Sequence, residues 1–276
     1  MEGYPTLNLR PVKKLICIAA LLLSSPIYPK VPTIVAHRGA SHDAPENTLP
    51  AFKLAWERGA DAIEGDFYLT KDGHVVCIHD KDTKRVAGTK LLVGDSTLAE
   101  LRKLDVGAWK DASFQGTAIP TIADVFTTIP PRKRIFIEIK CGSEIIPALL
   151  EQIGRSGLQA DQIVVICFNA QVLQELKAKS PGLKVSWLSG FKTDKATGEI
   201  TPSLDQVLQT LGRIGADGFS SNAGIPESYV EPIKANGYEW HVWTVNDLSL
   251  ANRMKGLGVQ SITTDRPGLL KKEMVQ

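Results

Sequence analysis

Short apolar runs alternate along this chain with stretches in which apolar residues recur at helical spacing. The runs are apolar nearly throughout, as is typical of parallel strands that are buried on both faces. The helical stretches are amphipathic and would cover such a sheet, so the pattern predicts an α/β fold. The expected strands are Thr33–His37, Ala62–Phe67, Arg134–Lys140, Ile163–Phe168, Lys184–Leu188, Ala216–Ser220, Trp240–Val245 and Val259–Thr264. The expected helices include Asn47–Arg58, Ser143–Arg155, Gln171–Lys179, Leu204–Ile214, Glu227–Ala235 and Leu248–Gly256.

The number of strand–helix units selects the architecture. Eight units favour a closed (β/α)₈ barrel over an open doubly wound sheet. The 276 residues suffice for one large barrel or two ordinary domains, and no repeat or charge block marks a second domain. The net charge of +2 excludes a global field that would recruit nucleic acid or coat an anionic membrane. Any phosphate recognition must therefore come from a local cluster.

One interval between strands is much longer than the others. The expected strands Ala62–Phe67 and Arg134–Lys140 start 72 residues apart, whereas most neighbouring starts are about 20 to 30 residues apart. The excess contains a strand-like piece, His74–His79, and then a polar, glycine-rich stretch. We therefore expect a small insertion after the second strand, at about residues 80–118, on the face that carries active-site loops. Residues 31–276 are expected to form one barrel domain with this insertion.

Residues 1–30 have the layout of a secretory signal, because Arg10, Lys13 and Lys14 precede an apolar run over residues 15–23. As a helix, the run with its flanking serines would reach roughly 17 Å, which is too short to span a hydrocarbon core of roughly 30 Å comfortably. We expect a signal peptide, with export to the periplasm or the cell exterior if it functions. The alternative is a disordered or interfacial N-terminal extension of a cytoplasmic protein. Neither interpretation includes a stable transmembrane span.

Three carboxylates are expected at the ends of two neighbouring barrel strands. Residues two apart on a strand share a face, so Glu64 and Asp66 project together, as do Glu138 and Lys140. Left unpaired in a pocket, the carboxylates would repel one another strongly. A hard divalent cation, Mg²⁺ or Ca²⁺, would relieve the repulsion because both ions take oxygen ligands. An internal ion network with Lys140 and Arg38 is the alternative, and the carboxylates alone do not favour either interpretation.

Two histidines favour a catalytic interpretation of this cluster. His37 ends the first expected strand, and His79 ends the strand-like piece after the second, so both should reach the face that carries the carboxylates. Two imidazoles on opposite sides of a reacting phosphorus could divide the general-base and general-acid roles. Arg38 and Lys140 would supply a planar fork and a compact charge for an anionic phosphoryl oxygen.

Ordered motifs extend over about residues 33–268. They are Val-Ala-His-Arg-Gly-Ala (35–40), Pro-Glu-Asn-Thr (45–48), Gly-Ala-Asp-Ala-Ile-Glu-Gly-Asp (59–66), Thr-Lys-Asp-Gly (70–73), His-Asp (79–80), Ile-Pro-Thr (119–121), Ile-Glu-Ile-Lys (137–140), Trp-Thr-Val-Asn (243–246) and Thr-Asp-Arg-Pro (264–267). Together they resemble the glycerophosphodiester phosphodiesterase family. The departures from the family pattern are at Gly65 and Phe67, where aliphatic residues are commoner, and both positions should face away from a metal.

The resemblance implies a TIM-type barrel with a small insertion and one divalent cation, Mg²⁺ or Ca²⁺. It also implies hydrolysis of a small-molecule glycerophosphodiester to glycerol 3-phosphate and an alcohol, and it carries no prediction of oligomeric state. The residues that match the family's functional positions are Glu64, Asp66 and Glu138 for the metal, His37 and His79 for acid–base catalysis, and Arg38 and Lys140 for phosphate.

Five further residues lie within or beside these motifs. Trp243 ends the seventh strand, where it could form an apolar wall against the substrate or simply pack inside the barrel. Asn47 is expected to cap the first helix rather than to bind a ligand. Glu46 is expected either to hydrogen-bond Arg38 or to touch substrate. Asp265, together with Arg266, is expected to form a structural turn after the last strand.

Two alternatives to a glycerophosphodiester phosphodiesterase are open at this point. A phospholipase D-like or sphingomyelinase-like enzyme would share the barrel, the histidines and the acidic site, but it would need an apolar surface beside the mouth for lipid chains. A noncatalytic binding protein on the same barrel would be expected to lack a histidine or a metal carboxylate. The mostly polar insertion disfavours the first alternative, and the complete set of residues disfavours the second.

Overall fold

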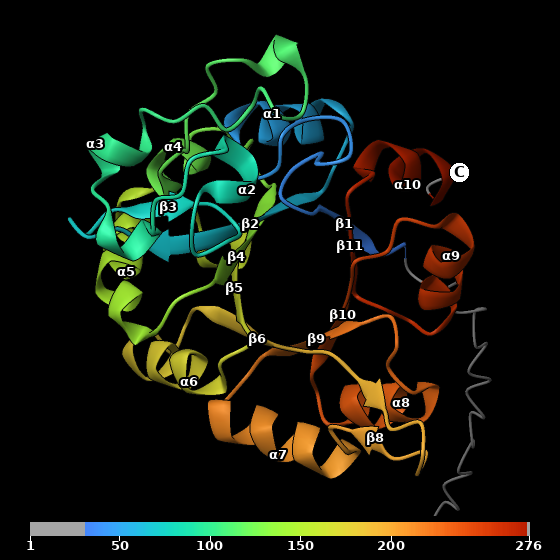
Figure 1. Ribbon diagram of the computed structural model, residues 1–276. Helices are drawn as coiled ribbons and strands as arrows, with labels where there is room; N and C mark the ends of the chain where they lie inside the picture. Colours follow the sequence, from blue (N-terminus) through green and yellow to red (C-terminus); the bar gives the residue numbers. More distant parts are fainter. Residues whose placement is uncertain (1–30, 275–276) are drawn as a thin grey trace, which may run out of the picture.

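The eight expected strands form one closed barrel. The computed structural model describes residues 31–274, and Figure 1 looks along the barrel axis. The barrel strands are β1 (Thr33–Ala36), β2 (Ala62–Leu69), β4 (Arg134–Ile139), β5 (Ile163–Cys167), β6 (Lys184–Ser189), β9 (Gly218–Asn222), β10 (Glu239–Trp243) and β11 (Ser261–Thr264). The ring closes because β1 pairs in parallel with both β2 and β11. The predicted TIM-type barrel is thus confirmed.

Helices cover the outer face of the barrel (Figure 1). They are α1 (Leu49–Glu57), α4 (Ile122–Phe126), α5 (Ile146–Arg155), α6 (Ala170–Lys179), α7 (Leu204–Ile214), α8 (Glu227–Ala235), α9 (Leu248–Gly256) and α10 (Pro267–Met274). The sequence did not predict α4 and α10. Helix α4 is short, but Thr121 and Asp124 form a capping box at its start. Helix α10 follows β11 directly and begins with Pro267, a residue suited to the first helical position.

Side chains on the barrel strands alternate between the interior and the helix layer. On β4, Ile135 and Ile137 pack into the core cluster beneath the helices, whereas Phe136 belongs to a separate interior cluster with Val35 and Ile166. Each fully buried aliphatic side chain contributes about 1.5–3 kcal/mol. Ile135 and Ile137 therefore hold β4 against the helix layer. The next inward-facing residue after Phe136 is Glu138, which carries a carboxylate into the barrel interior.

Strand β3 (Val75–Cys77) pairs antiparallel with the last three residues of β2, so that Cys77 lies beside Phe67. Phe67 is fully buried in the helix-layer cluster, and a Cβ added to Gly65 would meet Cys77, Phe67 and Phe52. Both positions therefore face away from Glu64 and Asp66, as expected from the two-residue period of a strand.

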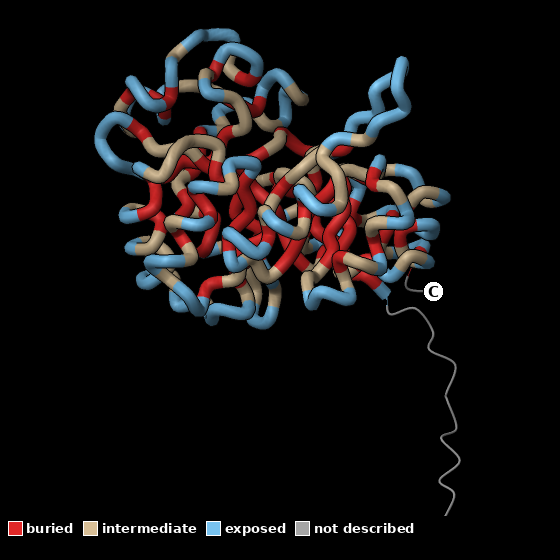
Figure 2. Tube along the Cα trace, turned by 90° about the horizontal axis from the view of Figure 1, so that it is seen from below, coloured by how far each residue is buried: buried red, intermediate tan, exposed pale blue. Residues whose placement is uncertain are grey.

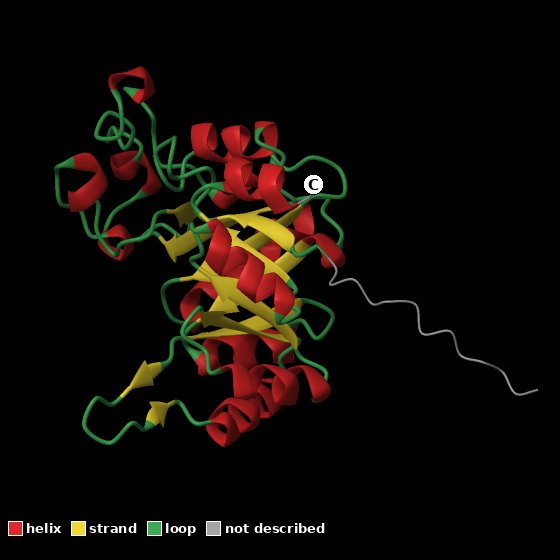
Figure 3. Cartoon of the chain, turned by 90° about the vertical axis from the view of Figure 1, so that its right-hand side faces the viewer, coloured by secondary structure: helices red, strands yellow, loops and turns green. Residues whose placement is uncertain are grey.

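Two projections rise from the same end of the barrel (Figures 2 and 3). The first, residues 78–121 between β3 and α4, contains α2 (Lys84–Ala87) and α3 (Leu98–Leu101), and we call it the β3–α4 segment. Its apolar side chains pack into a cluster of their own with β3. The second is a hairpin of β7 (Lys192–Thr193) and β8 (Ile200–Thr201), whose two-residue strands are too short to leave a pattern in the sequence.

The predicted leader, residues 1–30, lies outside the described residues, so export stays a prediction. Within residues 31–274, no helix has both the length and the apolar character needed to cross a membrane.

Gly39 lies in the turn after β1 and packs against α1. It has a φ of +82°, and an added Cβ would lie 2.6 Å from the backbone carbonyl carbon of Ala51. Gly39→Ala is expected to combine a left-handed backbone cost of about 1–2 kcal/mol with an overpacking cost of about 1–3 kcal/mol. Chemical denaturation measures the loss in the free energy of unfolding.

Gly73→Ala is the matched control. Gly73 has nearly the same φ, +83°, but no atom lies within 4 Å of an added Cβ. It should show only the backbone cost. Equal losses for the two variants would contradict the close packing of Gly39 on α1.

Candidate active site

A pocket of about 170 Å³ opens at the end of the barrel where the strands finish. Seven of the eight site residues expected from the sequence line it, and the eighth, Asp66, is buried and paired with Arg38 from the lining. The lining combines charged, polar and apolar side chains. The charged residues and histidines are His37, Arg38, Glu64, His79, Glu138, Lys140 and His241, the hydroxyl residues are Ser220, Thr244 and Thr263, and the apolar residues are Phe136, Ile166, Phe168, Leu188 and Trp243.

Three buried carboxylates meet at the carboxyl ends of β2 and β4. The register places Asp66 beside Glu138, and one oxygen of each of Glu64, Asp66 and Glu138 lies within 4.8 Å of the other two. Burial and the neighbouring Asp66 carboxylate raise the pKa of Glu64 to about 8. Burial and the Asp66 charge also raise the pKa of Glu138. Ionising all three carboxylates at the same time is therefore unfavourable.

Glu64 offers an oxygen that a cation would satisfy. Its Oε2 accepts a hydrogen bond from the backbone N–H of Arg38 at 2.9 Å. Its Oε1 is buried and has no hydrogen-bond donor among the described residues. Leaving a buried carboxylate oxygen unpaired is costly. The all-oxygen donor set of the three carboxylates fits a hard divalent cation such as Mg²⁺ or Ca²⁺.

Two basic side chains offset part of the negative charge. Arg38 Nε lies 3.2 Å from Asp66 Oδ2, and Lys140 Nζ lies 3.4 Å from Asp66 Oδ1 and 2.7 Å from Glu138 Oε1. Burial alone would raise the pKa of Asp66, but the two cations hold it below its ordinary value. The internal ion network considered as an alternative is therefore present. It does not reach Glu64 Oε1, so it coexists with a site that fits a cation.

Asn47 orients Asp66, and its expected role as a helix cap is wrong. Thr48 is the N-cap of α1, and its hydroxyl accepts a hydrogen bond from the backbone N–H of Ala51. Asn47 has a φ of +59°; its Nδ2 donates to Asp66 Oδ2 at 2.8 Å, and its Oδ1 accepts from the Asp66 backbone N–H at 3.1 Å. Both Asn and Thr are strong N-cap residues, so the sequence alone placed the cap one residue early.

His37 is held by a residue from the other end of the chain. Its Nδ1 donates to Asp265 Oδ1 at 2.7 Å, and Asp265 also accepts from Ser41 Oγ at 2.9 Å and from Asn246 Nδ2 at 2.6 Å. Burial lowers the pKa of His37, but the hydrogen bond to Asp265 and the negative charges of Glu64 and Asp265 together raise it above its ordinary value. Asp265 lies in the bend after β11, as expected, and it also holds the His37 ring, a role that the sequence did not predict. Its partner lies 228 residues away in sequence, beyond the reach of any local pattern.

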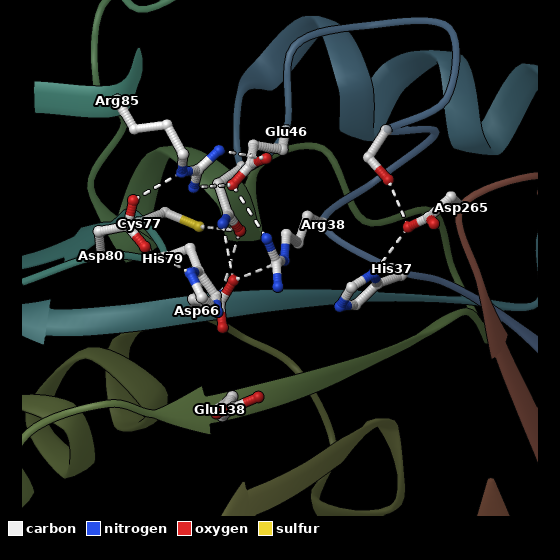
Figure 4. Close-up of polar contacts among 12 residues, drawn as sticks. His37, Arg38, Glu46, Asp66, Cys77, His79, Asp80, Arg85, Glu138 and Asp265 are labelled. Carbon is white, nitrogen blue, oxygen red and sulfur yellow. Dashed lines mark hydrogen bonds and ion pairs between the residues drawn. The ribbon is translucent and has the colours of Figure 1, made fainter. Parts of the chain in front are cut away.

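His79 is held in a similar way by its neighbour in sequence. Its Nδ1 donates to Asp80 Oδ1 at 2.7 Å, and Asp80 accepts from Arg85 Nε at 2.6 Å. Arg85 also pairs with Glu46. Glu46 accepts a hydrogen bond from Arg38, which is one of the two roles expected for it. Figure 4 shows these contacts as one continuous network. No motif or spacing in the sequence pointed to Arg85, which lies in a polar stretch without periodicity.

Trp243 packs inside the barrel, which is one of its two expected roles, and its contact with substrate stays a prediction. It packs against the interior cluster and also lines the pocket. Phe168 meets it edge to face, with ring centroids 5.5 Å apart. Phe168 is 49% exposed, and the sequence analysis treated it only as a strand residue. The pocket therefore has an aromatic corner beside its charged groups.

Comparison with known proteins gives consistent matches. The chain matches the Glycerophosphoryl diester phosphodiesterase family over residues 37–269. A glycerophosphodiester phosphodiesterase of Caldanaerobacter subterraneus subsp. tengcongensis is 36% identical over 86% of this chain and 95% of that protein. One from Bacillus altitudinis is 30% identical over 85% of this chain and 94% of that protein.

Solved structures agree with these matches. An Oleispira antarctica phosphodiesterase in complex with the product sn-glycerol-3-phosphate is similar with a TM-score of 0.80 and 28% identity, over 89% of this chain and 98% of that one. A glycerophosphodiester phosphodiesterase from Thermotoga maritima has a TM-score of 0.71 and 28% identity, over 87% and 97% of the two chains. The chain therefore belongs to the glycerophosphoryl diester phosphodiesterase family and is an enzyme that hydrolyses phosphoric diesters.

Proposed function

We propose that this enzyme hydrolyses glycerophosphodiesters to glycerol 3-phosphate and an alcohol, with one divalent cation and two histidines as the acid–base pair. One observation carries the proposal: His37 and His79, each tied through Nδ1 to an aspartate, line the same pocket as Glu64 and Glu138. The Oleispira antarctica phosphodiesterase supports the product, because that relative is in complex with sn-glycerol-3-phosphate.

Glu64, Asp66 and Glu138 would hold the cation, which is Mg²⁺ or Ca²⁺. A bound cation supplies Lewis-acid polarisation of a phosphoryl oxygen and lowers the cost of deprotonating a nucleophile. Arg38 and Lys140 lie beside the same carboxylates and would pair with the remaining phosphoryl oxygens.

The histidines would move the protons. In each ring Nδ1 is occupied by an aspartate, so Nε2 is the nitrogen left to exchange a proton with substrate. One ring would accept a proton from the attacking oxygen, and the other would donate a proton to the leaving alkoxide. Asp265 fixes the orientation of His37, and Asp80 fixes that of His79. Trp243 and Phe168 would form an apolar wall against the carbon atoms of the substrate.

Replacing either His37 or His79 with alanine is expected to lower kcat by at least about 10²-fold, the usual contribution of a positioned acid or base. His42→Ala is the control, because the His42 side chain is exposed and bonds its neighbour Asp43, whereas its backbone bond to the Asp265 carbonyl is kept in the alanine variant. Steady-state kinetics measure the effect, and circular dichroism verifies the fold. Near-normal turnover in both variants would overturn the two-histidine mechanism.

The substrate and cation are tested together with metal-stripped protein. We expect glycerol 3-phosphate to be released from at least one glycerophosphodiester of choline, ethanolamine, glycerol or inositol, and only after Mg²⁺ or Ca²⁺ is added. The measurement is an enzymatic assay of glycerol 3-phosphate. No release under any combination would contradict the proposal. Preferential cleavage of sphingomyelin or a lysophospholipid in parallel reactions would instead favour the phospholipase D-like alternative.

The acidic cluster should also make the metal-free protein sensitive to pH. The folded state holds a proton on Glu64 up to about pH 8, whereas the ordinary pKa is 4.5. The folded state therefore binds more protons than the unfolded chain between these values, and the free energy of unfolding should fall as pH rises through them. Thermal unfolding at several pH values measures the effect.

Glu64→Gln should flatten this pH dependence and weaken cation binding in a calorimetric titration. Glu231→Gln is the control, because Glu231 is a surface residue whose pair with Lys234 lies on α8. A pH profile unchanged by Glu64→Gln would contradict the shared burial of the three carboxylates.

A further inference from the structure

Arg85 in the β3–α4 segment contacts two carboxylates that each hold a candidate functional group. Its Nε donates to Asp80 Oδ2 at 2.6 Å. Its Nη1 and Nη2 donate to the two oxygens of Glu46 at 2.9 and 2.7 Å. One guanidinium therefore spans both acids, and it uses three of its donors to do so (Figure 4).

The first arm of this bridge leads to His79. Asp80 uses Oδ1 to accept from His79 Nδ1 at 2.7 Å and Oδ2 to accept from Arg85. With both oxygens occupied, the Asp80 carboxylate cannot turn without breaking a charge-assisted bond. Arg85 thereby fixes the Asp80 carboxylate, and Asp80 in turn fixes the His79 imidazole.

The second arm leads to Arg38. Glu46 Oε1 accepts from Arg38 Nη1 at 3.1 Å and from Arg85 Nη2 at 2.7 Å. Arg38 in turn lies 3.2 Å from Asp66 through Nε. The bidentate fork of Arg85 sets the plane of the Glu46 carboxylate, and that plane sets where the Arg38 guanidinium lies.

This bridge differs from an ordinary surface ion pair, which is worth little. The side chain of Glu46 is only 13% exposed, although that of Arg85 is 45% exposed. Burial alone would raise the pKa of Glu46, but the hydrogen bonds from Arg85 and the charge of Arg38 hold it below its ordinary value. Without Arg85, a nearly buried carboxylate would have Arg38 as its sole cation among these partners and would draw it away from the pocket.

We propose that Arg85 is a positioning residue that holds His79 and Arg38 in their working orientations at the same time. The proposal rests on the functions proposed above for His79 and Arg38. It makes the β3–α4 segment a part of the active-site framework, because α2 carries the residue that connects an acid–base group to a phosphate-binding group.

Arg85→Gln tests the proposal in the full-length enzyme. We expect kcat/KM to fall about 10- to 100-fold, the size of effect that loss of a supporting partner or a small misplacement causes. The variant loses the hydrogen bonds to both Asp80 and Glu46. KM should therefore rise and kcat should fall together, while the midpoint of thermal unfolding stays near that of the wild type. A purely structural role would instead lower the thermal midpoint and leave KM unchanged.

Arg253→Gln is the matched control. Arg253 also donates two hydrogen bonds to a glutamate, Glu227, but this pair is exposed and joins α9 to α8. It should leave both kinetic parameters unaltered. Arg85→Lys keeps the charge without the planar fork and is expected to retain an intermediate activity.

A background that lacks both acceptors decides whether Arg85 acts through them. In the Glu46→Gln, Asp80→Asn double variant, adding Arg85→Gln should change kcat/KM by less than about 3-fold, because no partners remain to lose. A further 10- to 100-fold fall in that background would overturn the positioning role. If Arg85→Gln does not fold, Arg85→Lys decides, and wild-type kinetics for the lysine variant would overturn the role of the fork.

The outcomes separate this proposal from the proposed function. A wild-type enzyme that releases no glycerol 3-phosphate from any glycerophosphodiester would contradict the proposed function. An active wild type with an unaltered Arg85→Gln variant would contradict only the role of Arg85.

Discussion

The mutual repulsion of three buried carboxylates is the constraint around which the rest of the site is arranged. Glu64, Asp66 and Glu138 lie on adjacent strands whose register is set by outward apolar side chains, so the acids cannot separate to relieve the repulsion. Arg38 and Lys140 reduce the charge from the side, yet one oxygen of Glu64 stays unpaired among the described residues. The barrel thus holds fixed an arrangement that its own side chains do not fully neutralise, which is what a metal site requires.

The functional side chains are held by residues outside the strands that carry the acids. Asn47 binds Asp66 from the loop before α1, Asp265 binds His37 from the turn after β11, and Arg85 reaches the network from α2. The β-barrel sets the positions of the backbones, whereas these loop residues set the angles of the side chains. This division explains how a rigid ring and irregular segments can share one site.

The sequence predicted the barrel well because buried parallel strands leave uninterrupted apolar runs, and all eight were recognised. It also predicted the charged residues and Trp243 of the pocket lining, since the carboxyl ends of parallel strands converge on one face. It missed contacts that depend on closure of the ring, such as that of His37 with Asp265 across 228 residues. It missed Arg85 as well, because the bends of the β3–α4 segment leave no periodic pattern. The two-residue strands β7 and β8 were below the length at which alternation is visible.

The pairing of β1 with β11 joins the beginning and the end of the fold. His37 follows the first of these strands and Asp265 follows the second, so the imidazole and its acceptor meet only when the last strand has docked. During synthesis on the ribosome, both histidines and all three acids emerge long before Asp265. A nascent or truncated chain would therefore carry most of the reactive groups without the partner that orients one of them. The orientation of the His37 ring by Asp265 therefore depends on the last strand of the barrel, although His37 itself follows the first.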